Sequence, residues 1–270
     1  MNQQQTITIG AEGTEYGNWM SAPVMKMAYG LVAILTVVDV LIIFLWKNPI
    51  GIGVATVLLV MVVYFALYLQ KVRNTFSFKK GRLMDRIIQN LVEHLSWDGN
   101  GTILDVGCGS GAVSIRVAKT IPTAKVVGID YWGPMWDYSD NMCSKNATLE
   151  NVSERCTFQH GDATGLEFEE ETFDAVVSNF VYHEVIGVSD KKTLLLESLR
   201  VLKKGGSFAL QDYFDRPDMF GTPDEVMNYL KEHGISEVYY EGNVDGKEWM
   251  PKYVLKSFII KDIGVVYGKK

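Results

Sequence analysis

The first quarter of the chain contains two long apolar segments. Residues 27–46 and 50–69 are nearly uncharged, and each has the roughly 20 residues that a helix needs to cross a hydrocarbon core of ~30 Å. The short link between them leaves room only for a turn, in which Pro49 suits the start of the second helix because its missing N–H is not needed there. The pattern predicts a transmembrane helical hairpin. A buried hairpin of a soluble protein is the alternative, although such helices normally keep a polar stripe.

Asp39 interrupts the first apolar segment. A carboxylate at that depth is costly enough that it usually faces a partner or a wet cavity. We expect Asp39 to be protonated or hydrogen-bonded across the hairpin, with Thr56 as the best-placed partner. Such a group either locks the hairpin, or a homo-oligomer that assembles through it, or it handles a proton or a substrate.

Lysine and arginine residues are distributed unevenly around the hairpin. The turn carries only Lys47, whereas the exit of the second segment carries Lys71, Arg73, Lys79, Lys80 and Arg82. Because short loops rich in these residues stay in the cytoplasm, we expect two spans, with the N-terminus and the rest of the chain on the cytoplasmic side. Trp19 lies just ahead of the first span, where it is either an interfacial anchor or part of a lid that contacts substrate.

From residue 100 onward, short β-branched runs alternate with amphipathic stretches. The pattern predicts strands at 102–106, 125–129, 157–160, 173–178, 207–211, 237–241 and 263–267, and helices at 112–120, 140–150, 191–202 and 223–233. This alternation is typical of an α/β fold in which helices cover both faces of a parallel sheet. We therefore divide the chain into an N-terminal interfacial segment (1–26), a transmembrane hairpin (27–69), a helical connector (70–98) and an α/β domain (99–270).

Net charge and cysteine spacing argue against a nucleic-acid partner and against a bound metal. The 270 residues carry a net charge of −6 and a pI of about 5.3, which is not the basic character of a nucleic-acid-binding protein. The three cysteines, Cys108, Cys143 and Cys156, do not have the spacing of a disulfide framework or a zinc site. We expect neither a nucleic-acid partner nor a bound metal.

The strongest chemical signal follows the first strand of the α/β domain. Gly107, Gly109 and Gly111 remove side chains where a backbone passes close to a ligand, and the next helix points its N-terminus there. Their spacing differs from the GxGxxG of dinucleotide folds. Asp130 ends the second strand about 20 residues further on, where a carboxylate accepts hydrogen bonds from a ribose. Asp162 ends the third strand, where it can meet an adenine amino group.

These motifs resemble those of the class I S-adenosylmethionine-dependent methyltransferases, in the branch of the ubiquinone and menaquinone enzymes. The matching segments are 104–111, 127–130, 161–163, 173–179, 202–206 and 263–270. The resemblance implies a Rossmann-like, seven-stranded, mostly parallel sheet with an antiparallel last strand, and S-adenosyl-L-methionine as cofactor. It assigns the methionine half to Asp105, Gly107, Cys108, Gly109 and Gly111, the ribose to Asp130, the adenine to Asp162 and Ala163, and the edge of the sulfonium to Asn179.

Candidates for the acceptor side follow the fourth strand, at the edge where open α/β sheets bind ligands. Histidine accepts protons near neutrality, so His183 is a candidate general base, with Glu184 as its orienting partner and Tyr182 as a substrate contact. A capping or packing role for His183 is the alternative.

An aromatic stretch after Asp130 departs from the family pattern. We expect Tyr131 to pack on adenine, and Trp132 or Trp136 to line an acceptor pocket or touch the bilayer surface. Ordinary core packing is the alternative for these side chains.

Together the two parts predict an integral-membrane methyltransferase that modifies a hydrophobic or lipid-borne acceptor by O-, N- or C-transfer. An anchor raises the local concentration of an acceptor dissolved in the bilayer. Two alternatives stay open: a tethered methyltransferase of a protein or soluble small molecule, and a non-catalytic membrane scaffold that binds S-adenosylmethionine.

Overall fold

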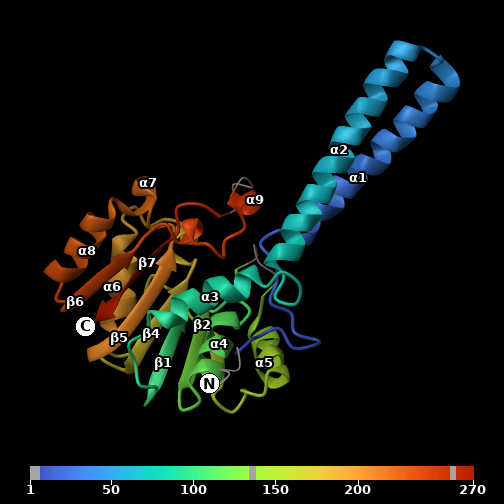
Figure 1. The fold of residues 1–270 in the computed structure, drawn as a ribbon. Helices are drawn as coiled ribbons and strands as arrows, with labels where there is room; N and C mark the ends of the chain where they lie inside the picture. The colour runs from blue at the N-terminus through green and yellow to red at the C-terminus, as the bar shows by residue number, and fades with distance from the viewer. Residues whose placement is uncertain (1–6, 134–137, 256–259) are drawn as a thin grey trace. The chain divides into compact units, whose positions relative to one another are not determined.

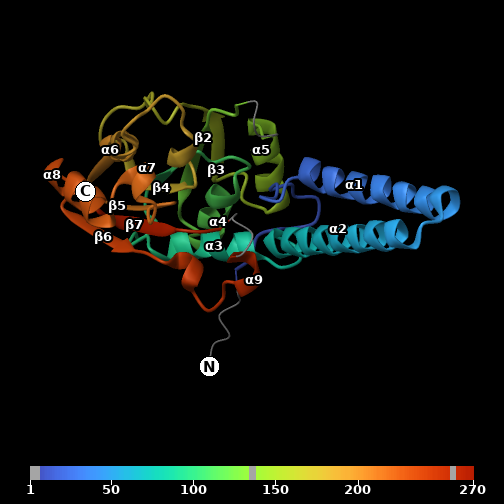
Figure 2. The same cartoon turned by 90° about the horizontal axis from the view of Figure 1, so that it is seen from above.

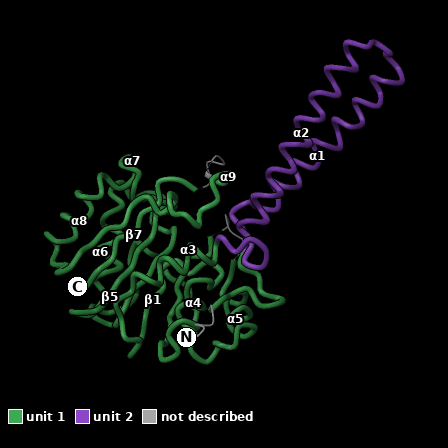
Figure 3. The backbone as a smooth tube through the Cα atoms, in the orientation of Figure 1, with its two compact units in different colours: residues 1–16, 84–270 green, residues 17–83 purple. Residues whose placement is uncertain are grey.

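The computed structural model describes residues 7–133, 138–255 and 260–270 (Figure 1). The chain divides into two compact units, one made of residues 1–16 and 84–270 and the other of residues 17–83 (Figure 3). We call these the α/β unit and the hairpin unit. The hairpin unit is therefore an insertion, because the chain leaves the α/β unit at Tyr16 and returns to it at Met84.

The α/β unit is built on a seven-stranded sheet in the order β3-β2-β1-β4-β5-β7-β6. Neighbouring strands from β3 to β5 pair in parallel, whereas β7 is antiparallel to both β5 and β6. The expected Rossmann-like sheet with an antiparallel last strand is confirmed. The strands are β1 (Thr102–Val106), β2 (Lys125–Asp130), β3 (Cys156–His160), β4 (Phe173–Asn179), β5 (Leu202–Asp212), β6 (Glu237–Glu241) and β7 (Gly264–Lys269).

Helices cover both faces of this sheet. The crossover through α4 leads from β1 toward one edge of the sheet, and the crossover through α6 leads from β4 toward the other edge. Because such crossovers are right-handed, α4 and α6 lie on opposite faces (Figure 2). The helices of the α/β unit are α3 (Leu83–Glu93), α4 (Ala112–Thr120), α5 (Asp140–Leu149), α6 (Lys192–Arg200), α7 (Pro217–Phe220), α8 (Pro223–Glu232) and α9 (Lys252–Leu255), with 3-10 turns at Tyr182–Glu184 and Val244–Gly246.

Burial on both faces explains the apolar runs of the central strands. Val176 of β4 and Phe208 of β5 are wholly buried in one continuous core, together with Leu104 of β1. The carboxyl ends of the parallel strands meet at one edge of the sheet. The loops that leave β1, β2, β4 and β5 are thereby brought to a common place, which is where such sheets bind ligands.

The hairpin unit consists of α1 (Ala22–Leu41), a π-helical turn (Ile42–Trp46) and α2 (Pro49–Phe76). Both helices are long and apolar enough to cross a membrane. The turn between them is closed by the Asn48 side chain, which accepts hydrogen bonds from the amides of Ile50 and Gly51 at 2.9 and 3.3 Å. Large apolar side chains face outward along the unit, and Leu45 and Ile50 are 78% and 77% exposed.

Asp39 and Thr56 join the two helices of the hairpin. Asp39 is buried, and the Thr56 hydroxyl donates toward its two carboxylate oxygens at 3.2 and 3.3 Å. The expected hydrogen bond across the hairpin is confirmed. A buried carboxylate whose acceptors are occupied is far less costly than a solitary one.

We expect Thr56→Val to lower the free energy of unfolding of the hairpin by about 1 kcal/mol, because it leaves the Asp39 carboxylate without this donor. Thr36→Val is the matched control, since the Thr36 hydroxyl only bonds back to the Val32 carbonyl on an exposed face. The measurement is denaturant-induced unfolding in detergent. Equal effects of the two substitutions would contradict a stabilising role for the Asp39–Thr56 bond.

Candidate cofactor and catalytic site

The turn after β1 is shaped by glycine. Gly107, Gly109 and Gly111 all have positive φ, at +72°, +55° and +81°. A Cβ on Gly107 would lie 2.2 Å from Cγ2 of Val181, so no side chain fits there. The Ile129 carbonyl of β2 accepts hydrogen bonds from the amides of Gly107 and Cys108 at 2.8 and 2.9 Å. The turn therefore passes tightly between neighbouring strands and leads directly into the N-terminus of α4, where an anionic or polar ligand is favoured.

Asp105 lies beneath this turn with one oxygen satisfied and one not. Its Oδ2 accepts a hydrogen bond from Ser114 at 2.6 Å, whereas its Oδ1 is buried and has no hydrogen-bond partner among the described residues. Burial raises the pKa of Asp105 to about 7. A buried, unpartnered carboxylate oxygen beside a glycine-rich turn fits the ammonium group on the methionine half of S-adenosylmethionine.

Asp130 and Trp132 clamp the turn from the side of β2. One carboxylate oxygen of Asp130 accepts from the Gly109 amide at 2.8 Å, and the other accepts from the Trp132 amide at 2.7 Å. The Trp132 indole in turn donates to the Gly109 carbonyl at 2.9 Å. Each carboxylate oxygen keeps a further lone pair, which suits the two hydroxyls of a ribose. Trp132 therefore supports the cofactor turn, and its indole N–H is already committed there.

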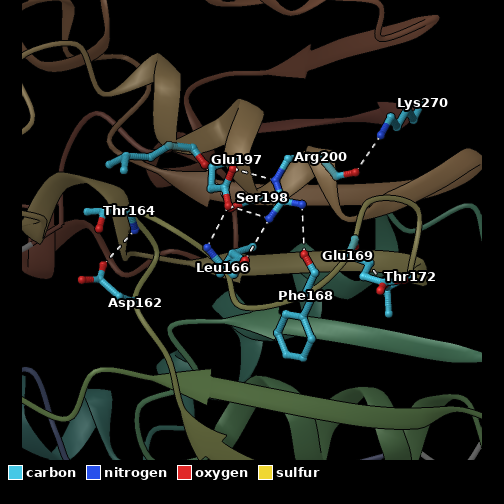
Figure 4. Close-up of polar contacts among 11 residues, drawn as sticks. Asp162, Thr164, Leu166, Phe168, Glu169, Thr172, Glu197, Ser198, Arg200 and Lys270 are labelled. Carbon is cyan, nitrogen blue, oxygen red and sulfur yellow. Dashed lines mark hydrogen bonds and ion pairs between the residues drawn. The ribbon is translucent and has the colours of Figure 1, made fainter.

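The remaining residues expected around the cofactor lie at the same edge of the sheet. Tyr131 is 62% exposed, and its ring centroid lies 5.3 Å from that of His160. Asp162 is exposed and accepts from the Thr164 amide at 2.8 Å, next to the half-buried Ala163 (Figure 4). Asn179 ends β4, and its side-chain oxygen accepts from Gln211 at 2.7 Å.

The loop that begins at Asp162 is held in place by α6. Arg200 donates to the carbonyls of Leu166 and Phe168, both at 2.9 Å, and pairs with Glu197, which accepts from the Leu166 amide at 2.7 Å (Figure 4). These bonds fix the segment behind Asp162 and so limit where its carboxylate can reach.

His183 forms a pair with a carboxylate that the sequence analysis did not single out. Its Nδ1 lies 2.7 Å from Oδ1 of Asp212, which ends β5 and is wholly buried. The other Asp212 oxygen accepts from the amides of Tyr182 and His183 at 2.9 and 3.3 Å. Glu184, the expected orienting partner, lies at the opposite ring nitrogen, with its Oε1 3.7 Å from Nε2. Asp212 therefore orients the imidazole through Nδ1, and Nε2 lies beside the Glu184 carboxylate.

Tyr182 requires a correction. Its side chain is wholly buried in the core, and its hydroxyl donates to Ser198 at 3.0 Å. Its burial leaves this ring no exposed surface for a substrate contact. The rings of Tyr213 and Phe180 lie edge-on to that of His183, with centroids 4.6 and 6.3 Å away. Trp136 lies outside the described residues. Trp19 belongs to the hairpin unit, where its ring packs 5.5 Å from that of Phe76.

Comparison with known proteins agrees with this geometry. Residues 103–206 match the family model of the methyltransferase domain. Demethylmenaquinone methyltransferase of Staphylococcus aureus is 40% identical over 108 residues, which cover 38% of this chain and 39% of that enzyme. Phosphoethanolamine N-methyltransferase 1 of Triticum aestivum is 32% identical over 149 residues, which cover 54% of this chain and 27% of that enzyme. Geranyl diphosphate C-methyltransferase from Streptomyces coelicolor shares the fold, with a TM-score of 0.54 at 14% identity over 71% of this chain and 80% of that one.

The sheet order, the glycine-rich turn and these similarities define the α/β unit as a class I methyltransferase domain. The matched stretch, residues 103–206, is a methyltransferase domain, and its glycine-rich turn, Asp105 and Asp130 fit S-adenosylmethionine as the cofactor. The chain spans only 39% and 27% of the length of the two curated relatives. Their acceptors are therefore not carried over to it directly.

Asp105 makes the stability of the ligand-free protein depend on pH. Because its pKa is raised in the folded state, the folded chain holds this proton more tightly than the unfolded chain, and the resulting stability is lost as the pH rises from about 4 to about 7. We expect Asp105→Asn, which stays neutral, to be more stable than the wild type at pH 8 by a few kcal/mol, at about 1.4 kcal/mol per pKa unit. Thermal unfolding of the two proteins at pH 5 and pH 8 measures this.

Asp174→Asn is the contrasting control. Burial alone would raise the pKa of Asp174, but hydrogen bonds from Lys203 and the Thr102 amide lower it, so this substitution should destabilise the protein at pH 8. A stabilised Asp174→Asn, or an Asp105→Asn that loses stability at pH 8, would contradict the assignment.

Proposed function

We propose that this protein is a methyltransferase, anchored by its hairpin, that transfers a methyl group from S-adenosylmethionine to a hydrophobic or lipid-borne acceptor at the cytoplasmic face of a membrane. The observation that carries the proposal is the presence, in one chain, of a methyltransferase domain and of two helices long and apolar enough to span a bilayer. The staphylococcal relative is named for demethylmenaquinone, which supports an apolar acceptor.

Two features of the hairpin unit support a membrane location. The outward-facing apolar side chains of both helices suit the hydrocarbon core of a bilayer. Lys71, Lys79 and Lys80 are exposed at the end of the hairpin where the chain rejoins the α/β unit, and the positive-inside rule favours a cytoplasmic location for that end. Anchoring there would concentrate the enzyme against acceptors that partition into the bilayer.

The chemistry asked of this chain is mainly one of positioning. When bound, the cofactor supplies an already activated methyl group on its sulfonium. The turn at residues 107–111, Asp105 and Asp130 would hold it, and Asn179 would border the methyl. Alignment of an acceptor with that methyl in a closed pocket contributes several kcal/mol through proximity and orientation.

His183 would remove the proton that the acceptor must lose. Nε2 of His183 would take the O–H proton of a phenol or enol acceptor as that acceptor bonds the methyl carbon, and it would take the N–H proton of an ammonium acceptor before the nitrogen attacks. In either case the methyl–sulfur bond would break and S-adenosylhomocysteine would leave. Asp212 accepts a hydrogen bond from Nδ1, which fixes the tautomer with its free lone pair on Nε2 and stabilises the imidazolium that forms. Asp212 also accepts hydrogen bonds from the backbone amides of Tyr182, His183 and Tyr213. These bonds hold the carboxylate in place independently of the histidine ring.

The function is tested with labelled methyl from S-adenosylmethionine in native membranes that contain or lack the protein, followed by partition into organic, aqueous and protein fractions. We expect label in the organic phase, and its loss by at least tenfold in Asp130→Ala, because that substitution removes the carboxylate assigned to the ribose. Asp224→Ala, an exposed aspartate at the start of α8, is the matched control and should keep full activity.

The other fractions distinguish the alternatives. Label confined to the aqueous or protein fraction would replace the lipid acceptor by a soluble or protein acceptor. Absence of label from all fractions, with cofactor binding intact, would favour a non-catalytic scaffold.

We expect His183→Ala to lower turnover about 100-fold or more, the usual range for loss of a general base, while cofactor affinity changes less than twofold. Asp212→Asn should lower turnover by a smaller factor, because the imidazole is then held in the wrong tautomer. The control is His233→Ala, since His233 is exposed and its ring forms a hydrogen bond with the Tyr229 carbonyl of the preceding helical turn. Wild-type turnover in His183→Ala between pH 6 and pH 9 would rule out the general-base role.

A further inference from the structure

The segment that precedes the hairpin is bound to the α/β unit along its whole described length. We call residues 7–16 the strap. Ile9, Thr14 and Tyr16 are buried at 1%, 7% and 6% exposure, although the segment has no helix or strand of its own. Figures 1 and 2 both show this dark-blue stretch beside α5. A segment without regular structure satisfies its backbone polar groups with side chains or water. Asn146 of α5 and Glu150, which follows α5, make four hydrogen bonds to backbone groups of the strap.

Glu150 anchors the first half of the strap. Its side chain accepts hydrogen bonds from the amides of Gly10 and Ala11, the latter at 2.9 Å, and from the Tyr16 hydroxyl at 3.3 Å. Lys119 of α4 pairs with the second carboxylate oxygen at 2.5 Å. Arg116 of α4 adds a bond to the Ile7 carbonyl at 2.8 Å. This half is thus fastened to α4 and to the residue that follows α5.

Asn146 connects the second half of the strap to the glycine-rich turn. Its side chain is wholly buried, and it pairs with both backbone groups of Glu15: its oxygen accepts from the amide at 2.8 Å, and its nitrogen donates to the carbonyl at 2.9 Å. The same nitrogen donates to the Ser110 carbonyl at 3.0 Å. The Ser110 hydroxyl then donates to the Tyr16 carbonyl at 3.2 Å. Strap, α5 and turn therefore close a ring of hydrogen bonds around Ser110, between the two glycines Gly109 and Gly111.

We propose that the strap is part of the cofactor site, and that Asn146 is the positioning residue through which it holds the glycine-rich turn in its binding conformation. The turn has positive φ at three glycines, which are the residues with the most backbone freedom to lose on binding. Holding it in the ligand-free protein removes that entropic cost from cofactor binding. The inference rests on the turn as cofactor site and is independent of the acceptor.

The test is calorimetric binding of S-adenosylhomocysteine to the full-length protein in detergent, together with hydrogen exchange of the ligand-free turn. We expect Asn146→Ala to raise the Kd at least tenfold and to speed exchange of the amides at residues 107–113. Ser110→Ala, which removes only the hydroxyl bond to Tyr16, should raise the Kd two- to fivefold and provides the answer if Asn146→Ala does not fold. Lys145→Gln is the matched control on the same helix, because it breaks only an exposed ion pair with Glu15, and it should change neither quantity.

Two results would overturn the proposal. One is a folded Asn146→Ala or Ser110→Ala protein with a lowered melting temperature and wild-type affinity, since the strap would then only stabilise the fold. The other is a wild-type protein that does not bind S-adenosylhomocysteine, which would remove the cofactor site itself. Failure of lipid methylation with tight S-adenosylhomocysteine binding would refute the proposed acceptor and leave the strap unaffected.

Discussion

The close approach of the Gly107 backbone to the Val181 side chain is the constraint on which the site depends. Val181, just beyond β4, occupies the space that a side chain at Gly107 would need, so the loops that leave β1 and β4 are locked against each other. That contact sets the position of the turn relative to Asn179, which ends β4, and to His183, which lies in the 3-10 turn after it. Asp130, Trp132 and Asn146 then fix the turn from its other sides. The cofactor residues and the candidate base are thereby placed by one packing contact and a set of hydrogen bonds, rather than by separate supports.

Much of the fold follows from local pattern. The helix at Ala112–Thr120 and the strand at Glu237–Glu241 have the predicted bounds, because each is delimited by glycine, proline or a change of periodicity. The first strands are predicted to within one residue for the same reason. β5 begins at Leu202, five residues earlier than predicted, because Leu202 pairs with Phe173 of β4 across a register shift. The Lys-Lys-Gly-Gly stretch that follows Leu202 has no strand pattern of its own, so this pairing with a distant strand could not be predicted from it. The helices of the hairpin extend beyond the apolar segments, since hydrophobicity marks only the part that suits a membrane.

The site residues could be predicted where neighbouring residues form a motif, and they could not be predicted where the contact joins residues distant in sequence. Glycines and acids at strand ends mark the cofactor edge directly. Asp212 was missed because it lies 29 positions from His183 and its sequence neighbourhood resembles any strand end. Tyr182 was misjudged because adjacency to His183 does not reveal that its ring points the other way, into the core toward Ser198. The strap was missed for a related reason: residues 7–16 are polar and glycine-rich, and their order comes from Asn146 and Glu150, not from their own composition.

The insertion of the hairpin unit has a consequence for how the protein is made. Glu15 is synthesised before both apolar helices, yet its hydrogen-bond partner Asn146 follows 131 positions later, and the final antiparallel strand comes at the end of the chain. Residues 7–16 must therefore remain without these partners while the ribosome synthesises the hairpin and the chain up to α5. Contacts so distant in sequence form late. The hydrogen bonds between the strap and Asn146 can thus form only after the apolar hairpin has left the ribosome.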